Sequence, residues 1–275
     1  MRTPAVLMPF LAKRIFKHDP VEITDEWGLR DLRPGIAYSL CNTLECVDCG
    51  VLFLDYRFSD LELSLLYDNY RGPEYNATRT YFEPGYAAIA STFQCRSPYL
   101  DAVEKFLSQH LPKQPKVLDW GGDSGINSPF RFQASALHVY DISGVETCPE
   151  AKAVTYEECI NHSYDLVACS QVLEHVPYPL TVLEQIKKHL RPETLLYLEV
   201  PLEDTFKKQN LGCKLGSTKR HWHEHINFFS PASLQALVST VNLTVLAFET
   251  LPISSGWKES TVQMLICKSV AQDAG

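Results

Sequence analysis

The chain has 275 residues, a formal net charge of −8 and a sequence pI of about 5.6. Its 45% hydrophobic and 21% charged residues are typical of an ordinary globular protein with one large domain and a small appendage. The acidic balance argues against a general nucleic-acid-binding protein, so no nucleic-acid partner is expected. No apolar run reaches the roughly 18 residues that a membrane span requires.

The N-terminal segment is mildly apolar, but Pro4 and Pro9 interrupt it, so it lacks the clean apolar core of a signal peptide. The chain has nine cysteines, an odd number, and Cys169 and Cys267 lie in apolar strand-like runs. Such cysteines are typical of buried reduced thiols rather than of a disulfide framework. We therefore expect a cytoplasmic protein.

Residues 1–58 show no strong periodicity and are predicted to form an N-terminal appendage. Cys46-x-x-Cys49, followed by Gly50 and an apolar strand-like run, is one half of a zinc knuckle. A full site needs a second pair, which the preceding residues lack; Cys41 is a nearby supplement. Two interpretations stay open: a relic of a zinc module packed by apolar side chains, and a working zinc site.

Residues 59–96 are predicted to form a helical lid or linker. Ser59, with Glu62 three residues later, is a capping box that begins an amphipathic helix. The polar and aromatic segment 75–82 follows, and the alanine-rich segment 84–95 favours a second helix.

Residues 97–275 alternate strand and helix signals, which implies a mostly parallel sheet with helices on both faces. A helix begins near Ser97, and we expect a helix of two or three turns between Gly125 and Leu137. A third helix is predicted over 179–190 and a fourth from Ser230. The strands are predicted near 116–120, 137–141, 152–155, 165–169, 194–200, 243–248 and 261–267.

The predicted strand over 116–120 leads into a glycine-rich turn. Its apolar run reaches Asp119 and then breaks at Gly121, Gly122 and Gly125. Glycines let the backbone bend sharply and let a ligand approach main-chain N–H groups. Asp141, about twenty residues after Asp119, ends the next strand, where nucleotide-binding α/β folds hold a ribose by its hydroxyls.

These residues resemble the class I S-adenosylmethionine-dependent methyltransferases. Residues 119–125 are similar to the first motif of that family, residues 140–142 to the second and residues 164–176 to the fourth. The resemblance implies a Rossmann-like α/β fold whose seven-stranded, mostly parallel sheet has an antiparallel C-terminal edge. It also implies S-adenosylmethionine as cofactor. Asp123 is a departure, because it stands where the middle glycine usually is and brings charge near the methionine end of the cofactor.

The resemblance also implies roles around the cofactor. Asp141 accepts hydrogen bonds from the ribose, while Gly121 and Gly125 give the amino-acid end access to the backbone. In resembling enzymes a segment like 75–82 folds over the cofactor as a lid; a surface loop with packed tyrosines is the alternative. The cofactor-binding candidates are Asp119, Gly121, Gly122, Asp123, Gly125, Asp141, Ile142, Ser170, Gln171 and Tyr81.

Two histidine sites are candidates for proton transfer, which a hydroxyl or an acidic carbon requires before it accepts a methyl group. His175 follows the fourth motif, where a Glu-His pair borders the site in many family members. The segment 221–230 resembles an E-H-x-x-x-F-S block of sugar-active methyltransferases. That resemblance implies His225 as the base and Glu224 as its orienting partner.

His223 departs from that block, because a tyrosine is often found at its position. The departure leaves hydroxyl methylation open beside methylation of a sugar carbon. Two alternatives remain for this segment: a structural His/Trp cluster, and a metal site of the three histidines His221, His223 and His225.

The sequence therefore predicts methyl transfer from S-adenosylmethionine to a small molecule, most simply a sugar of nucleotide-sugar or surface-polysaccharide metabolism, a context that comes from the family resemblance alone. Two alternatives stay open: an O-methyltransferase of a quinone-like or other small acceptor, because such enzymes share the block 173–176, and a non-catalytic methyltransferase-like module. The aromatic N-terminal segment suggests a homodimer.

Overall fold

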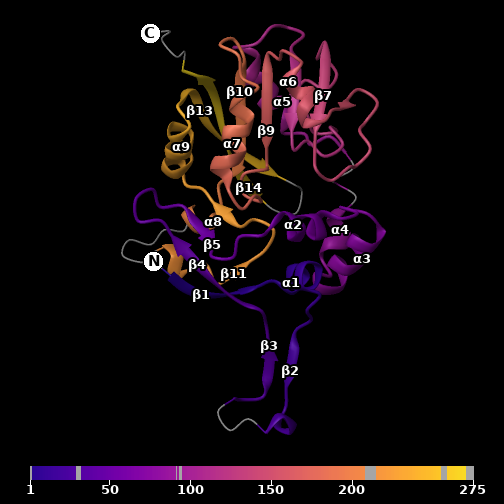
Figure 1. Ribbon diagram of the computed structural model, residues 1–275, viewed down its shortest axis with the longest axis vertical. Helices are drawn as coiled ribbons and strands as arrows, with labels where there is room; N and C mark the ends of the chain where they lie inside the picture. The colour runs from indigo at the N-terminus through magenta and orange to yellow at the C-terminus, as the bar shows by residue number, and fades with distance from the viewer. Residues whose placement is uncertain are drawn as a thin grey trace.

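The computed structural model describes residues 2–28, 32–90, 92, 95–207, 215–254 and 259–270. Figure 1 shows a body of two parts with a narrow arm below it. The upper part holds the larger sheet, and the lower part holds a smaller sheet and the helices that follow it in the chain.

The larger sheet has seven strands in the order β13-β14-β10-β9-β6-β7-β8. Strands β8, β7, β6, β9 and β10 pair in parallel, and β14 pairs antiparallel with both β10 and β13. This arrangement confirms the predicted Rossmann-like sheet with an antiparallel C-terminal edge. Its strands are β6 (Lys116–Trp120), β7 (Ala136–Tyr140), β8 (Lys152–Ala153), β9 (Leu166–Ser170), β10 (Leu195–Pro201), β13 (Leu243–Ser254) and β14 (Glu259–Ser269).

Helices cover both faces of this sheet, which is why its central strands are apolar along their length. On one face, α7 (Pro179–Lys187) and α9 (Pro231–Thr240) belong to an apolar cluster with β9 and β10. On the other face, α5 (Leu100–Ser108) buries four apolar side chains. These are Leu100, Val103, Phe106 and Leu107.

The segment between Gly125 and Leu137 was expected to contain a helix, and this expectation was wrong. The structure has turns there. Pro129 removes a backbone donor, and Phe130 has a φ of 59° that a right-handed helix does not contain. The short helix α6 (Tyr156–Ile160) lies farther along, after β8, and begins with a capping box at Thr155.

The smaller sheet has five strands in the order β11-β1-β4-β5-β12. Three come from the N-terminal segment: β1 (Arg2–Leu7), β4 (Leu40–Glu45) and β5 (Leu52–Leu54). The other two, β11 (His221–Trp222) and β12 (Asn227–Phe228), come from the histidine-rich segment and pair with β1 and β5. The N-terminal appendage therefore holds both ends of the segment that carries His223, Glu224 and His225.

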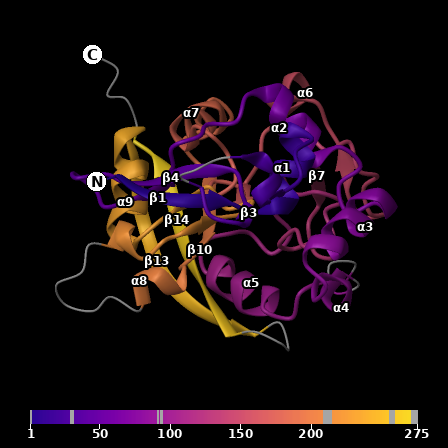
Figure 2. The same ribbon diagram turned by 90° about the horizontal axis from the view of Figure 1, so that it is seen from below.

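Four helices pack beside the smaller sheet. They are α1 (Pro9–Phe16), α2 (Asp60–Tyr67), α3 (Pro73–Phe82) and α4 (Tyr86–Ala90). The predicted capping box at Ser59 is present. The Ser59 side chain accepts a hydrogen bond from the Glu62 backbone N–H, and the Glu62 side chain accepts one from the Ser59 backbone N–H. Figure 2 shows these helices from below, on the side of the molecule that carries α5 and β7.

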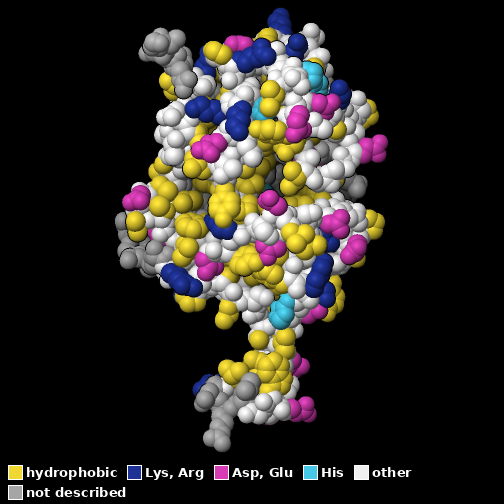
Figure 3. Space-filling model, viewed as in Figure 1, with side chains coloured by type: hydrophobic (Ala, Val, Ile, Leu, Met, Phe, Trp, Pro, Cys, Tyr) yellow, Lys and Arg dark blue, Asp and Glu magenta, His cyan; other side chains and the backbone are white. Residues whose placement is uncertain are grey.

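A two-stranded arm projects from the lower part of the body. Strands β2 (Val21–Ile23) and β3 (Gly35–Ala37) pair antiparallel, with the 3-10 turn η1 (Asp25–Trp27) between them. Figure 3 shows apolar side chains gathered on the arm, of which Trp27, Ile36 and Tyr38 are exposed. The homodimer suggested by this region stays a prediction.

Two short elements connect β10 to the histidine-rich segment: the helix α8 (Asp204–Lys207) and the 3-10 turn η3 (Leu215–Ser217). In the part of the chain that the structure describes, no helix is both long and apolar enough to cross a bilayer.

Candidate functional site

The glycine turn directly follows β6 at the carboxyl edge of the larger sheet. Gly121 and Gly125 have φ values of 77° and 76°, and a Cβ atom on Gly121 would lie 2.5 Å from the Val172 side chain. Both positions therefore need glycine. Asp123, between them, also has a left-handed backbone, with a φ of 53°.

Asp119 lies buried under this turn. Its Oδ2 accepts a hydrogen bond from the Ser128 hydroxyl at 2.5 Å, and a Cβ atom on Gly122 would meet its carboxylate. Burial raises the pKa of Asp119 to about 7. Asp119 is thus placed to support the turn from below.

Asp141 joins the glycine turn to the loop after β7. One carboxylate oxygen accepts from the Asp123 N–H at 2.8 Å, and the other accepts from the Ser143 N–H at 2.7 Å. Ile142, beside it, is 70% exposed. The structure therefore brings Asp141 and the glycine turn together, as the ribose-binding prediction requires.

The end of β9 forms another wall of the site. Gln171 has a φ of 57°, and its side-chain amide donates to Glu199 at 2.9 Å. Glu199 is buried and also accepts from the hydroxyls of Tyr99 and Tyr197. Glu199 therefore accepts from three side chains and fixes Gln171, and Ser170 before it, at the edge of the sheet.

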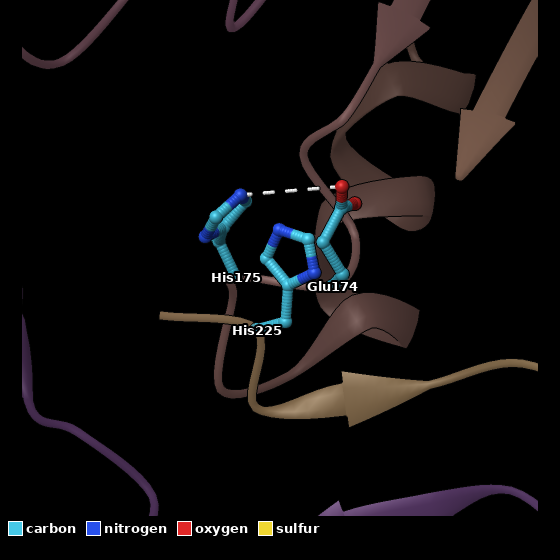
Figure 4. A group of neighbouring side chains, drawn as sticks. All are labelled: Glu174, His175 and His225. Atoms are coloured by element: carbon cyan, nitrogen blue, oxygen red, sulfur yellow. Dashed lines mark ion pairs between the residues drawn. The ribbon is translucent and has the colours of Figure 1, made fainter. Parts of the chain in front are cut away.

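His175 and His225 meet beside this edge although 50 positions separate them in the chain. Their rings stand edge to face with centroids 4.6 Å apart. Figure 4 shows that His175 comes from the loop after β9, that His225 comes from the loop before β12, and that Glu174 faces both. Glu174 is fully buried, its carboxylate oxygens have no hydrogen-bond partner in the described part of the chain, and burial raises its pKa to about 7.

The carboxylate that contacts His225 belongs to Glu203. Nδ1 of His225 lies 2.8 Å from Oε1 of Glu203, which follows β10. Burial by itself lowers the pKa of His225, but the Glu203 hydrogen bond and the nearby carboxylates raise it above its usual value. For His175, burial and the neighbouring His225 lower the pKa to about 3. The pKa values of the two histidines are therefore shifted in opposite directions.

The sequence pairs His225 with Glu224, whereas the structure directs the Glu224 carboxylate elsewhere. It accepts hydrogen bonds from the Tyr75 hydroxyl and from Nη1 of Arg79 at 2.7 Å. Burial opposes its ionisation, but Arg79 and the nearby histidines lower its pKa to about 2. The adjacent Glu224 backbone carbonyl lies 3.1 Å from Nδ1 of His175. Glu224 thus anchors the loop that carries His225.

His221 and His223 do not join His225. His223 stacks on Phe10 and lies 2.5 Å from Glu83, and His221 is exposed. A three-histidine metal site is therefore not formed by the described side chains. The residues there whose ligand atoms do lie close enough for a metal ion, within 4.8 Å of one another, are Glu174, His175 and His225.

The predicted lid segment forms α3, and its side chains have different positions from those expected. Tyr81 is 78% exposed, whereas Tyr75 is fully buried against Glu224. Just before α3, Arg71 forms an ion pair with Asp123 of the glycine turn at 3.2 Å. Cys46 and Cys49 of the half knuckle are free thiols and belong to no metal-ligating group among the described residues.

The sequence alone does not indicate Glu203, Tyr75, Arg79 and Arg71 as site residues. A signal for Glu203 exists, because it follows a predicted parallel strand at the sheet edge where ligands bind. The other three lie within residues 59–96, where the sequence alone does not indicate which polar side chains turn inward.

Comparison with known proteins agrees with this geometry. A family model described as a methyltransferase domain matches residues 93–247, more than half of the chain. The chain belongs to this methyltransferase family. Residues 93–247 are therefore a methyltransferase domain.

Curated relatives match a shorter stretch. A ubiquinone biosynthesis O-methyltransferase of Haemophilus ducreyi is 29% identical over 148 residues, which are 43% of this chain and 61% of that protein. One of Vibrio cholerae is 26% identical over 113 residues, or 39% of this chain and 45% of that protein. The chain thus spans less than two thirds of the length of these relatives.

A solved structure shows the same fold. The 1,6-didemethyltoxoflavin-N1-methyltransferase of Burkholderia thailandensis was crystallised with 1,6-didemethyltoxoflavin and S-adenosylhomocysteine. It superposes with a TM-score of 0.52 at 16% identity, covering 82% of this chain and 99% of that one.

Proposed function

We propose that the protein transfers the methyl group of S-adenosylmethionine to a hydroxyl of a small, sugar-like acceptor, with His225 as the base and Glu203 as its orienting partner. The observation that carries this proposal is the 2.8 Å contact between His225 Nδ1 and Glu203, next to the edge of the sheet where the glycine turn lies. His175 borders the acceptor in this proposal, and Glu224 holds the loop.

The hydrogen bonds determine which ring nitrogens carry protons. An ionised carboxylate only accepts, so in the neutral ring Nδ1 of His225 donates to Glu203 and Nε2 keeps a lone pair. A backbone carbonyl also only accepts, so Nδ1 of His175 donates to Glu224 and its Nε2 keeps a lone pair as well. Two neighbouring lone pairs suit an acceptor that brings a hydroxyl proton.

The two histidines would share the work. The raised pKa of His225 makes it the stronger base, and Glu203 stabilises the imidazolium that forms when it takes the proton. His175, with a pKa near 3, stays neutral and accepts a hydrogen bond that positions the acceptor. The cofactor supplies the reactive methyl group. Alignment of acceptor oxygen and methyl carbon is the task of the protein.

The sugar class rests on the polar character of the site and on the Glu224-His225 block. Glu203, whose carboxylate contacts His225, offers hydrogen-bond acceptors to the hydroxyls of a polyol. Nucleotide-linked sugars and glycan precursors are the acceptors that we place first. Free thiols among the described cysteines support a cytoplasmic location for this reaction.

We divide the chain by role into residues 1–58, 59–96 and 97–275. The last part would bind the cofactor, and the first part would hold the acceptor loop through β1 and β5. The middle part would close the site through α3. Figure 3 shows a hollow between the upper and lower parts of the body, where an acceptor would reach the sheet edge.

A second candidate is O-methylation of a quinone-like phenol. It is favoured by the curated relatives, which are ubiquinone biosynthesis O-methyltransferases at 26% and 29% identity. The same His225 chemistry would serve a phenol, whose hydroxyl is more acidic than that of a sugar.

One assay separates these candidates. The protein is incubated with methyl-labelled S-adenosylmethionine and either a panel of nucleotide sugars or a panel of catechols, and labelled product is measured. Label in a nucleotide sugar that is lost in His225→Gln supports the proposal; label in catechols alone supports the second candidate. Parallel reactions with EDTA test whether Glu174, His175 and His225 hold a metal ion. Loss of activity with EDTA would indicate a metal-dependent reaction, with these three residues as the candidate ligands, and would contradict the role of His225 as base.

A further inference from the structure

Arg71, in the connection between α2 and α3, lies against Asp123 in the glycine turn. Its Nη1 is 3.2 Å from Oδ2 of Asp123, and the two side chains are 31% and 28% exposed. The Asp123 N–H donates to Asp141, so this ion pair adjoins the carboxylate expected to hold the ribose. The pair therefore connects the lid segment to the cofactor turn.

Asp123 makes the turn more costly than a glycine would. Glycine adopts a φ of 53° without strain and buries no charge. Burial and the nearby Asp141 raise the pKa of Asp123, while Arg71 lowers it. The Arg71 guanidinium therefore stabilises the ionised form of the partly buried Asp123 carboxylate.

The charges of the pair match those of the ligand end that this turn receives. The amino-acid end of S-adenosylmethionine carries one carboxylate and one ammonium group. A guanidinium binds a carboxylate through two parallel hydrogen bonds, and a carboxylate binds an ammonium group by charge-assisted hydrogen bonds. Arg71 and Asp123 thus offer one complementary group for each charge of that zwitterion.

We propose that Arg71 and Asp123 recognise the amino-acid end of the cofactor together, Arg71 binding its carboxylate and Asp123 its ammonium group. The inference deepens the proposed function and rests on it, because it requires S-adenosylmethionine to lie over the glycine turn. In the structure the two side chains neutralise each other, and the bound cofactor takes over part of each contact. Arg71 also lies just before α3, the helix whose Tyr75 and Arg79 hold Glu224.

Isothermal titration with two ligands tests the role of Arg71. S-adenosylhomocysteine has the amino-acid end, and 5′-methylthioadenosine lacks it. Arg71→Ala is expected to weaken S-adenosylhomocysteine about tenfold to hundredfold and to leave 5′-methylthioadenosine unchanged. Lys187→Ala is the matched control: it removes a cation that donates to the Val241 carbonyl at the far end of α7, and it should change neither affinity.

Two further ligands assign the charges separately. Decarboxylated S-adenosylmethionine lacks the carboxylate, and a deaminated analogue of S-adenosylhomocysteine lacks the ammonium group. Arg71→Ala should weaken the deaminated ligand but not the decarboxylated one. Asp123→Asn should show the reverse, a several-fold loss for the decarboxylated ligand only. Arg71→Lys should restore part of the affinity for S-adenosylhomocysteine, because it keeps the charge but loses the two-pronged contact.

The outcomes separate the two proposals. Equal affinity of Arg71→Ala and the unaltered protein for S-adenosylhomocysteine overturns the inference. Equal loss for S-adenosylhomocysteine and 5′-methylthioadenosine also overturns it, because Arg71 would then act on the fold. Binding of neither ligand by the unaltered protein overturns the proposed function at its first step.

Discussion

The proposed site has a cofactor half and an acceptor half, and the two are built in different ways. The cofactor half consists of three segments that end neighbouring strands of one sheet: the glycine turn after β6, Asp141 after β7 and Gln171 after β9. The acceptor half joins His175, His225 and Glu203 from three loops, and the loop with His225 is held at both ends by strands of the N-terminal sheet.

This difference teaches where each half is vulnerable. The cofactor half depends on backbone conformation at a few positions, which the parallel sheet fixes. The acceptor half depends on buried charge contacts. The carboxylate of Glu224 is held by Tyr75 and Arg79, and this contact positions the neighbouring residue His225 through the backbone. Variants in each half should therefore fail in different measurements.

His225→Ala should have the largest effect, because it removes the base. We expect kcat to fall about 10²- to 10⁴-fold, the usual contribution of general base catalysis. Binding of S-adenosylhomocysteine, measured by titration, should stay unchanged. His221→Gln, at an exposed position in the same segment, is the control. A similar fall in cofactor affinity would mean that the two halves are not separable.

Glu224→Gln should act mainly on stability. Removal of one partner of a buried ion pair typically costs about 3–5 kcal/mol, and we expect the lower end of this range because Arg79 loses Glu224 but keeps Glu83. Urea unfolding at pH 7 measures this loss. The pKa of Glu224 is lowered to about 2, so its contribution is present above its ordinary pKa and is lost as the pH falls toward 2. The difference between variant and unaltered protein should therefore shrink at pH 3; a constant difference would exclude this charge contact as its source.

Asp141→Ala should act on the cofactor half. We expect the affinity for S-adenosylhomocysteine to fall about tenfold to hundredfold, because the ribose loses a charged hydrogen-bond acceptor. Asp141 also holds the Asp123 and Ser143 N–H groups, so thermal unfolding is measured beside the titration. Unchanged affinity with a normal unfolding temperature would remove Asp141 from the cofactor site.

Glu203→Gln should have the smallest effect, about tenfold in kcat, and a distinct pH signature. Glu203 helps raise the pKa of His225, and a base works only when deprotonated. Activity therefore declines as the pH falls through the pKa of His225, and this acid limb should move to lower pH in the variant. A pH–rate profile without any displacement would contradict the orienting role of Glu203.

The fold was largely predictable from local signals. The predicted strands overlap β6 to β10, the predicted capping box at Ser59 is present, and a helix begins after Ser230 as predicted. The expected helix after Gly125 failed because backbone geometry at Phe130 overrides the alternation of strand and helix. The candidate site was predictable only in part: the sequence indicated its histidines and glycines, and it did not indicate Glu203 as the residue that contacts His225.

The sequence by itself determined the seven-stranded sheet, the glycine turn and Asp141, because each depends on residues within one short segment and on the fixed direction of parallel strands. Only the tertiary structure decided that Glu203 contacts His225, that Glu224 faces Tyr75 and Arg79, and that Arg71 meets Asp123. These contacts join residues far apart in the chain. Their partners are chosen by packing and by the need to pair buried charges, and no local pattern records that choice.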